Sequence, residues 1–430
     1  MKPITFISKQ WKKFNGLGRS LKMFIIVTIF FGLFFSVRSL FFNFYILSLG
    51  FDKDFLGLSN SMAPAATLVL GLPLGMLTDR IGRKKAATYG LVIQVLGYGL
   101  MLLTTSSGLI LVSLFVAGIG ETLFFVSRTP LLTRLTDRQN RNYVFSIDMA
   151  LSTLAGVIGT AVGGQMPGWF EAIFSISAES TASYQGVLLA SLSLVLLAII
   201  PIGMIEPGSK SQPESVTADS KLNSNALKDM QDILHNPAIW RLVLPNLFIG
   251  LGAALMVPYF NIFFVETFQI SNQVLGNLFS AASLLTGLSI LASPWLASRL
   301  GGRIRAIVSA QAVSLVFLLA VGFSPWLGLA IIGFLGRGAL MNMTHPLYAA
   351  FAMEQVDEDQ QGAFNSILTL TWQVGWALMP LVSGIVQERY GFTPIFISTG
   401  LLYATGISLL WIFFKNSEEV PQAQSVPQTS

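Results

Sequence analysis

Cysteine is absent from this 430-residue chain, and histidine occurs only at His235 and His345. The first absence excludes disulfide frameworks, thiolate metal sites and thiol nucleophiles. The second excludes a histidine-rich metal site, so we expect neither a metal nor another cofactor. Charged residues are also scarce, at 11% of the chain, whereas soluble domains carry roughly 25%. This shortage disfavours a soluble globular protein.

Apolar residues make up 53% of the chain, and its mean hydropathy is +0.66. They gather in runs of about 20 or more residues, the length that a helix needs to cross ~30 Å of hydrocarbon. The sequence therefore predicts an all-α membrane protein with twelve transmembrane helices. The predicted spans are 23–48, 55–77, 86–105, 108–132, 144–166, 184–204, 242–268, 273–297, 304–323, 326–351, 363–387 and 393–414.

The net charge of +5 does not indicate nucleic-acid binding, because the basic residues lie in short loops between apolar spans. If the N-terminus is cytoplasmic, 22 of the 26 Lys and Arg residues fall on the cytoplasmic side. Such an excess sets membrane orientation, so we expect both termini in the cytoplasm. Loop 352–362 carries four acidic residues and no basic one, but acidic residues count little in this rule.

Two polar stretches, one in the middle of the chain and one at its N-terminus, set the boundaries of the predicted segments. The longer one, with Gly, Ser and Pro in its first half, separates the sixth span from the seventh and is typical of a linker. The N-terminal segment holds six basic residues and no acid; a short interfacial helix and a disordered tail both fit it. The predicted segments are the basic cytoplasmic N-terminus 1–22, a six-helix bundle 23–204, the cytoplasmic linker 205–241, a second six-helix bundle 242–414 and a disordered cytoplasmic tail 415–430.

The two bundles look like copies of one unit. Residues 42–45 (FNFY) match 260–263 (FNIF) at an offset of 218, and 80–82 (RIG) match 299–301 (RLG) at 219. Each match is weak, but the offsets agree. A six-span unit duplicated around a polar linker is the plan of many transporters, whose substrate site lies near the membrane midplane.

Residues 75–85 read GMLTDRIGRKK, in the loop after the second span. This loop resembles the G-x-x-x-D-R-x-G-R-[KR]-[KR] signature of the major facilitator superfamily. The resemblance, which covers essentially the whole chain, implies two six-helix bundles that rock to give alternating access, without use of ATP. A Walker A motif is absent from the sequence, which agrees with that implication.

The resemblance also implies a cytoplasmic gate. Within the motif, Gly75 would let two helices approach closely and Gly82 would permit a tight turn. The basic residues would meet acidic partners such as Asp137; anchoring the topology is their alternative role. The predicted gate residues are Gly75, Asp79, Arg80, Gly82, Arg83, Lys84, Asp137 and Asp148.

Span 5 is similar to the glycine-rich antiporter motif of the drug-exporting branch of the superfamily. It departs from that motif at Gly156, where the spacing differs, and at Thr160, which replaces proline. Leu114 also stands where that branch carries an arginine. Ordinary small-residue helix packing explains the same glycines, so antiport stays open.

Ionisable residues inside spans cost at least ~2.5 kcal/mol and are functional candidates. Glu121 and Arg337 occupy equivalent positions in the two halves, in the fourth and tenth spans. We expect them to face each other across the cavity that the family builds from spans 1, 4, 7 and 10; a static pair between the bundles is the alternative. Glu121 is the best candidate for protonation, and His345 is a second candidate for proton coupling.

The predicted substrate-binding residues are Arg38, Asn43, Tyr45, Asn261 and Arg337. Arg38 lies in the first span with Phe42 and Tyr45 on its helical face, an arrangement that suits an acidic amphipathic substrate. An internal partner for Arg38, with Glu121 the obvious one, is equally open. Asn43 and Asn261 are repeat-related, and could either contact substrate or link helices.

These features predict a secondary active transporter, proton-coupled, that exports a small hydrophobic or amphipathic organic solute. Proton-coupled uptake of an organic anion and flipping of a lipid or glycolipid are the alternatives. Convergent catalytic groups are missing, which disfavours an enzyme. We expect a multi-pass protein of the plasma (inner) membrane, whose partners are a small-molecule substrate, protons and membrane lipid. No nucleic acid is expected, and the family resemblance implies a monomer.

Overall fold

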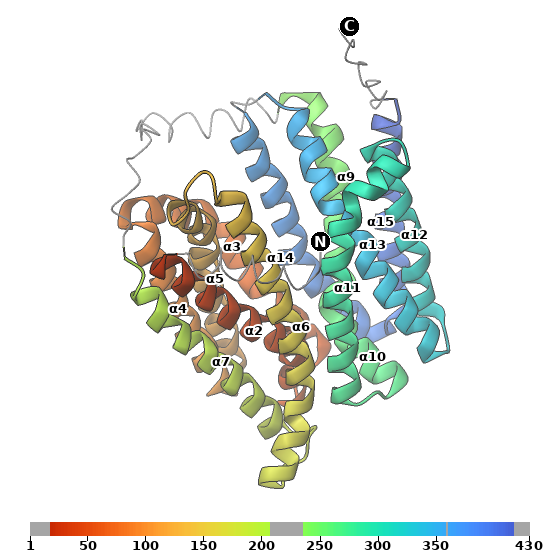
Figure 1. Ribbon diagram of the computed structural model, residues 1–430. Helices are drawn as coiled ribbons and strands as arrows, with labels where there is room; N and C mark the ends of the chain where they lie inside the picture. The colour runs from red at the N-terminus through yellow and green to blue at the C-terminus, as the bar shows by residue number, and fades with distance from the viewer. Residues whose placement is uncertain (1–17, 207–234, 358–359, 417–430) are drawn as a thin grey trace, which may run out of the picture. The chain divides into compact units, whose positions relative to one another are not determined.

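The computed structural model describes residues 18–206, 235–357 and 360–416 (Figure 1). Within these ranges twelve helical segments are long and apolar enough to cross a membrane, and no strand is found. The prediction of an all-α, multi-pass membrane protein with twelve spans is therefore confirmed. Most of the predicted N-terminal segment, most of the linker and nearly all of the C-terminal tail lie outside the described residues.

The helices begin and end within a few residues of the predicted spans, with one exception. Helix α6 continues eight residues past the predicted end at 166. Pro167 does not end the helix, and the residues after it, which include Trp169 and Glu171, are also helical. The first six spans are α2 (Arg19–Ser48), α3 (Lys53–Ile81), α4 (Arg83–Leu102), α5 (Ser107–Arg134), α6 (Arg141–Phe174) and α7 (Thr181–Gly203).

The seventh span is not one regular helix. Its α-helical turns are interrupted at Pro258, which has no N–H to donate and stands in a short 3-10 turn. The second set of elements is α9 (Pro237–Met256), η1 (Val257–Tyr259), α10 (Phe260–Phe268), α11 (Asn272–Arg299), α12 (Arg303–Phe323), α13 (Leu327–Glu354), α14 (Gln361–Tyr390) and α15 (Thr393–Phe414).

The chain forms two compact units. Unit 1 comprises Met1–Thr217 and Phe264–Ser280, and unit 2 comprises Ala218–Phe263 and Ala281–Ser430. Each unit holds most of one predicted six-span bundle, although the division falls inside the seventh and eighth spans. The two segments of unit 1 are joined by an ion pair of 2.6 Å between Lys53 Nζ and Glu266 Oε2.

Close helix packing in unit 1 depends on small residues of α5. A Cβ added at Gly120 would lie 2.6 Å from the backbone nitrogen of Gln94 on α4. One added at Gly118 would lie 2.6 Å from the Cα of Ala63 on α3. Because both distances are shorter than real Cβ contacts allow, α5 can hold α3 and α4 this closely only with glycine at these positions.

Unit 2 is packed in the same manner. A Cβ at Gly333 of α13 would lie 2.8 Å from the carbonyl oxygen of Phe317 on α12. Helix α9 contacts both α14 and α15, with Gly250 and Gly375 in close approach. At the end where α12 begins, Ile304, Phe351 and Phe364 belong to one buried apolar cluster. The cluster also includes residues of α9 and α15, so five helices pack around one core.

The turn between α3 and α4 consists of a single residue, Gly82, at φ +90° and ψ +140°. This backbone region is unfavourable for residues with a Cβ, so the predicted need for glycine is confirmed. The repeat-related turn between α11 and α12 uses Gly301 at φ +70° and Gly302 at φ +150°. The second copy of the motif lacks the acidic residue, but its turn still uses glycines at positive φ.

Candidate functional site

Three side chains from three helices meet inside unit 1. Arg38 of α2 lies 3.3 Å from Glu121 of α5, measured between Nη2 and Oε1. Tyr98 of α4 donates a hydrogen bond of 2.8 Å from its hydroxyl to the same carboxylate oxygen. The side chains of Arg38 and Glu121 are only 18% and 13% exposed. The carboxylate is thus held by one cation and one hydroxyl in a largely dry environment.

Aromatic rings surround this cluster. The Arg38 guanidinium carbon lies 5.1 Å from the ring centroids of both Phe35 and Tyr98, within the range of cation–π attraction. Phe34 contacts Tyr98 with ring centroids 5.5 Å apart, and Phe31 stacks on Phe124 at 4.6 Å. We call Arg38, Glu121 and Tyr98 with these rings the Arg38–Glu121 centre. Its rings offer a hydrophobic surface beside an ionisable pair.

The structure decides one alternative that the sequence left open. The internal partner of Arg38 is Glu121, and the rings that its guanidinium carbon is recorded to approach are those of Phe35 and Tyr98. Tyr98 was missed by sequence reasoning. Its position between Gly97 and Gly99, a phenol flanked by two close-packing residues inside a span, was the signal that marked it.

Arg337 of α13 has a different environment in unit 2. It is 6% exposed, and it donates a hydrogen bond of 2.8 Å from Nη2 to the hydroxyl of Tyr403 on α15. Its guanidinium carbon lies 5.1 Å from the ring centroid of Phe260. Within the described residues it has no acidic partner, and its Nε has no hydrogen-bond acceptor. Glu121 and Arg337 therefore each have their partners inside their own unit, and whether they face each other stays a prediction.

The other predicted substrate-binding residues are buried and already bonded. Asn43, 3% exposed, accepts a hydrogen bond of 3.0 Å from Asn60 of α3, which supports its alternative role of linking helices. Tyr45, 1% exposed, donates its hydroxyl to the carbonyl oxygen of Leu102 at 3.2 Å. Asn261 is 2% exposed, and its Oδ1 accepts from the backbone N–H of Ile262. Substrate contact by these three residues stays a prediction.

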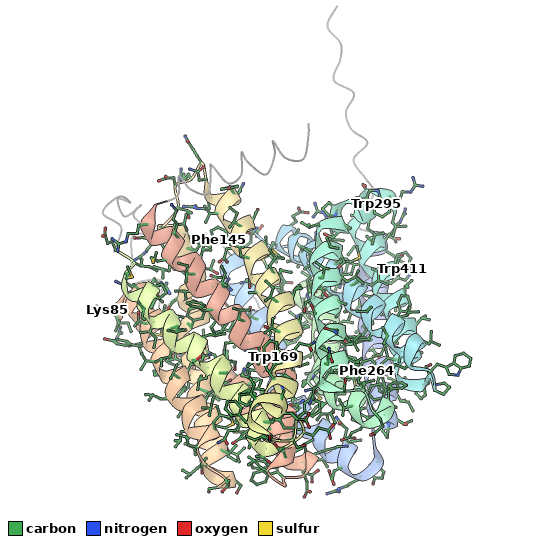
Figure 2. The ribbon with its side chains drawn as sticks, turned by 60° about the horizontal axis from the view of Figure 1, so that its bottom comes forward. Lys85, Phe145, Trp169, Phe264, Trp295 and Trp411 are labelled. Carbon is green, nitrogen blue, oxygen red and sulfur yellow. The ribbon has the colours of Figure 1, made fainter. Side chains whose placement is uncertain are left out.

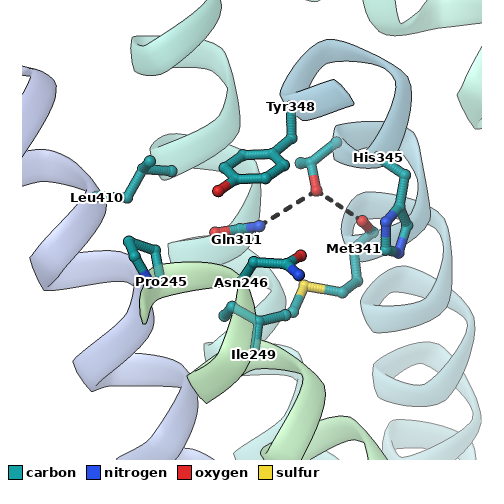
Figure 3. A pocket seen from close by; sticks show the side chains of 9 residues that line it. Pro245, Asn246, Ile249, Gln311, Met341, His345, Tyr348 and Leu410 are labelled. Atoms are coloured by element: carbon teal, nitrogen blue, oxygen red, sulfur yellow. Dashed lines mark hydrogen bonds between the residues drawn. The ribbon is translucent and has the colours of Figure 1, made fainter. Parts of the chain in front are cut away.

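His345 borders a small polar cavity in unit 2 (Figure 3). The cavity volume is about 20 Å³, room for about one water. Gln311 donates to Thr344 Oγ1 at 3.3 Å across it, and Asn246 and Tyr348 complete its polar lining. The His345 ring meets Trp372 edge-on at 5.6 Å. A proton-relay role for His345 stays a prediction.

Asp148 ties three helices of unit 1 together. Its carboxylate accepts a hydrogen bond of 2.8 Å from Thr28 of α2 and pairs with Arg128 of α5 at 2.7 Å. The side chains of Arg128 and Asp148 are 20% and 12% exposed, so this pair is largely enclosed within unit 1. Asp148 therefore stands apart from the motif residues to which it was assigned, and its part in a gate stays a prediction.

The motif loop is bonded mainly to itself and to α7. Arg83 donates to the Asp79 carboxylate and, at 3.2 Å, to Thr78 Oγ1, while Lys84 Nζ donates to the carbonyl oxygen of Gly203 at 2.7 Å. Within the part of the chain that the structure describes, neither Asp137 nor Arg80 has an ion-pair partner, so the expected link from the motif to Asp137 is absent from this arrangement. The long side chains of Arg83 and Lys84 donate to these acceptors and not to Asp137.

Gly75 does not mark a close helix approach inside unit 1, and its part in the gate stays a prediction. Among the described residues, the nearest atom to an added Cβ is Val126 Cγ1 at 4.0 Å, which is ordinary contact. The tight approach between α3 and α5 lies instead at Gly118, as described above. Crossing helices touch most closely at one point, and here that point lies far along α3 from the motif.

A comparison with protein families decides the assignment. The family described as the Major Facilitator Superfamily matches residues 23–266 and 246–429. The chain belongs to the major facilitator superfamily. It is therefore a membrane transporter and not an enzyme, and the resemblance inferred from residues 75–85 is confirmed. The described residues include no group of three or more His, Asp or Glu side chains suited to hold a metal ion.

Individual relatives match only part of the chain. The multidrug resistance protein MdtH of Yersinia enterocolitica is 27% identical over 119 residues, which is 28% of this chain and 30% of that protein. The match thus spans under a third of the length of the curated relatives.

Solved structures match the fold over nearly the whole chain. A bacterial homologue of the human lysosomal transporter Spinster aligns with a TM-score of 0.73 at 14% identity, covering 92% of this chain and 96% of that one. The nucleoside transporter NupG aligns with a TM-score of 0.72 at 16% identity, covering 93% and 99%. At this identity the likeness shows the fold alone.

Proposed function

We propose that this chain is a proton-coupled transporter of the inner membrane that exports a small hydrophobic or amphipathic organic solute. The observation that carries the proposal is the Arg38–Glu121 centre, an ion pair enclosed by aromatic rings. Its carboxylate is the proton-coupling group, and its rings offer the surface for an apolar solute. The partial likeness to a multidrug resistance protein favours the same direction of transport.

Coupling follows from the chemistry of the pair. When Glu121 accepts a proton its charge is lost, and Arg38 is left as a partly buried cation whose environment is less favourable. A cationic or polarisable solute that settles among the rings competes with Arg38 for the same carboxylate. Proton and solute therefore bind with linked free energies, which is what exchange of one for the other requires.

The arrangement in the membrane belongs to the same proposal. Both termini lie in the cytoplasm, and the chain works as a monomer of two bundles joined by the linker 205–241. The motif loop 78–85 and Asp148 form the cytoplasmic gate, with Arg83 and Lys84 breaking their bonds to Asp79 and Gly203 as it opens. Rocking of the bundles then exposes the Arg38–Glu121 centre to each side in turn.

Inside-out membrane vesicles with an acidified lumen test the proposal. Hydrophobic dyes, organic anions and lysolipids are added in turn, and the lumenal pH is followed. We expect one hydrophobic class to dissipate the pH gradient, and Glu121→Gln to abolish that response. Glu171→Gln, which changes an exposed glutamate of α6, is the matched control and should respond as the unaltered protein does. A full response from Glu121→Gln would overturn Glu121 as the proton carrier.

A second candidate function, uptake of an organic anion with a proton, is favoured by Arg337. A buried arginine without an acidic partner in the described chain is a strong donor to a carboxylate or phosphate. Right-side-out vesicles should then accumulate an organic anion, and Arg337→Gln should stop it. Arg389→Gln, at the exposed end of α14, is the control. Anion uptake that survives Arg337→Gln removes this candidate.

A further inference from the structure

A groove opens on the surface of unit 2 between α12 and α15, at the end where α12 begins and α15 ends. Its volume is about 510 Å³, within the range of sites that hold small molecules. The residues that line it are Leu300, Arg305, Val308, Ser309, Ile407, Ser408 and Trp411. We propose that this groove binds the headgroup and the upper acyl chain of an anionic phospholipid.

The first argument is an available cation. Arg305, in the first turn of α12, is exposed, and among the described residues it has no acidic partner. Its neighbour Arg303 is already engaged with Glu354 at 2.7 Å. A guanidinium at the end of a membrane span lies at headgroup depth, where it can donate two hydrogen bonds to one phosphate. Arg305 therefore supplies the charge that an anionic headgroup requires.

The second argument is a pair of unbonded hydroxyls. Ser309 and Ser408 are exposed and make no hydrogen bond within the described chain, although other membrane serines such as Ser36 and Ser289 donate to backbone carbonyls. Ser309 lies six residues into α12, about 9 Å from its start. That is the depth of the glycerol esters, whose carbonyl oxygens accept hydrogen bonds. A lipid in the groove would satisfy hydroxyls that hydrocarbon alone leaves without a partner.

The third argument is the shape and chemistry of the walls. Val308 and Ile407 supply apolar sides on which an acyl chain can pack. Trp411 on α15 (labelled in Figure 2) is 40% exposed at the same end, where tryptophan favours the boundary between headgroups and hydrocarbon. Lys415 follows one helical turn later, close to the same helical face. Two cations above an apolar groove complement a negative headgroup joined to a hydrocarbon chain.

Native mass spectrometry of the full chain, purified in detergent, tests the charge preference. Dioleoylphosphatidylglycerol and dioleoylphosphatidylcholine share their chains and their phosphate but differ in net charge. We expect the phosphatidylglycerol to bind more tightly. Arg305→Gln should weaken its binding about fivefold, the effect of one cation near an anionic lipid surface, and leave phosphatidylcholine unchanged. Arg389→Gln, which removes an exposed cation elsewhere in unit 2, should change neither.

A second measurement locates the lipid without removing charge. Phosphatidylglycerol with brominated acyl chains should quench the fluorescence of Trp411, seen as a larger loss of signal in the unaltered protein than in Trp411→Phe. Ser408→Leu keeps both cations but fills the groove, and should reduce that difference. Equal lipid affinities with and without Arg305, or quenching that Ser408→Leu leaves intact, would overturn the proposal. So would displacement of the lipid by millimolar inorganic phosphate, because that would make the ligand a free anion.

Discussion

The ion pair between Arg38 and Glu121 makes a quantitative prediction about stability. At 3.3 Å, and with an effective dielectric constant of about 20, two unit charges attract by ~5 kcal/mol. Glu121→Gln keeps the shape and an oxygen that can accept from Tyr98, but removes this attraction. The neutral amide is in turn easier to bury than a carboxylate. We expect the free energy of unfolding to fall by about 3 kcal/mol. This is the low end of the range for buried pairs, because both side chains are partly exposed.

The second half of the prediction concerns the double variant. Most of the loss arises because Arg38 is left buried without a counter-charge, so Arg38→Met combined with Glu121→Gln should recover more than half of it. The coupling free energy of the pair should then exceed about 1.5 kcal/mol, because the double variant loses less than half of what Glu121→Gln loses alone. Glu171→Gln, at an exposed site, should change stability by less than about 0.5 kcal/mol.

Unfolding in mixed micelles by increasing fractions of sodium dodecyl sulfate, followed by tryptophan fluorescence, gives the four free energies of the cycle. The same four variants enter the vesicle assay for proton exchange. If the free energies of the two single variants add to that of the double variant, Arg38 and Glu121 do not interact as the distance implies. The argument from charge pairing would then fail, whatever the transport result.

Further substitutions test the packing and the two other buried charges. Gly120→Val should destabilise by about 2 kcal/mol because its Cβ would overlap the backbone of α4, whereas Gly156→Val, which meets nothing within 4 Å in the described chain, should be tolerated in the same unfolding titration. Arg337→Met should leave stability equal or higher, since the charge it removes is buried without an acidic partner; a clear loss of stability would contradict this. Asp148→Asn should lower the unfolding midpoint because it leaves Arg128 without its counter-charge. Asp148→Asn combined with Arg128→Gln should recover part of the lost midpoint.

Local features of the sequence were sufficient for much of the fold. Each span must satisfy its own backbone hydrogen bonds and be about 20 apolar residues long, so length and hydropathy predicted all twelve. The motif at residues 75–85 predicted the family, and the left-handed geometry of Gly82 was readable because only glycine adopts it without strain. The seventh span, in contrast, was predicted as one continuous segment, and only the structure shows the 3-10 turn at Pro258.

Tertiary structure decided which polar groups meet. Sequence periodicity gives the face of a helix on which Arg38 lies, but not the neighbour to which that face turns, because helix rotation and crossing depend on every contact along the bundle. Symmetry between the repeats made Arg337 the predicted counterpart of Glu121, whereas the packing inside unit 1 showed its contacts with Arg38 and Tyr98. In the same way Arg128 found Asp148. The sequence determined that a few costly charges stand inside the membrane, and only the packed helices determined which of them are paired.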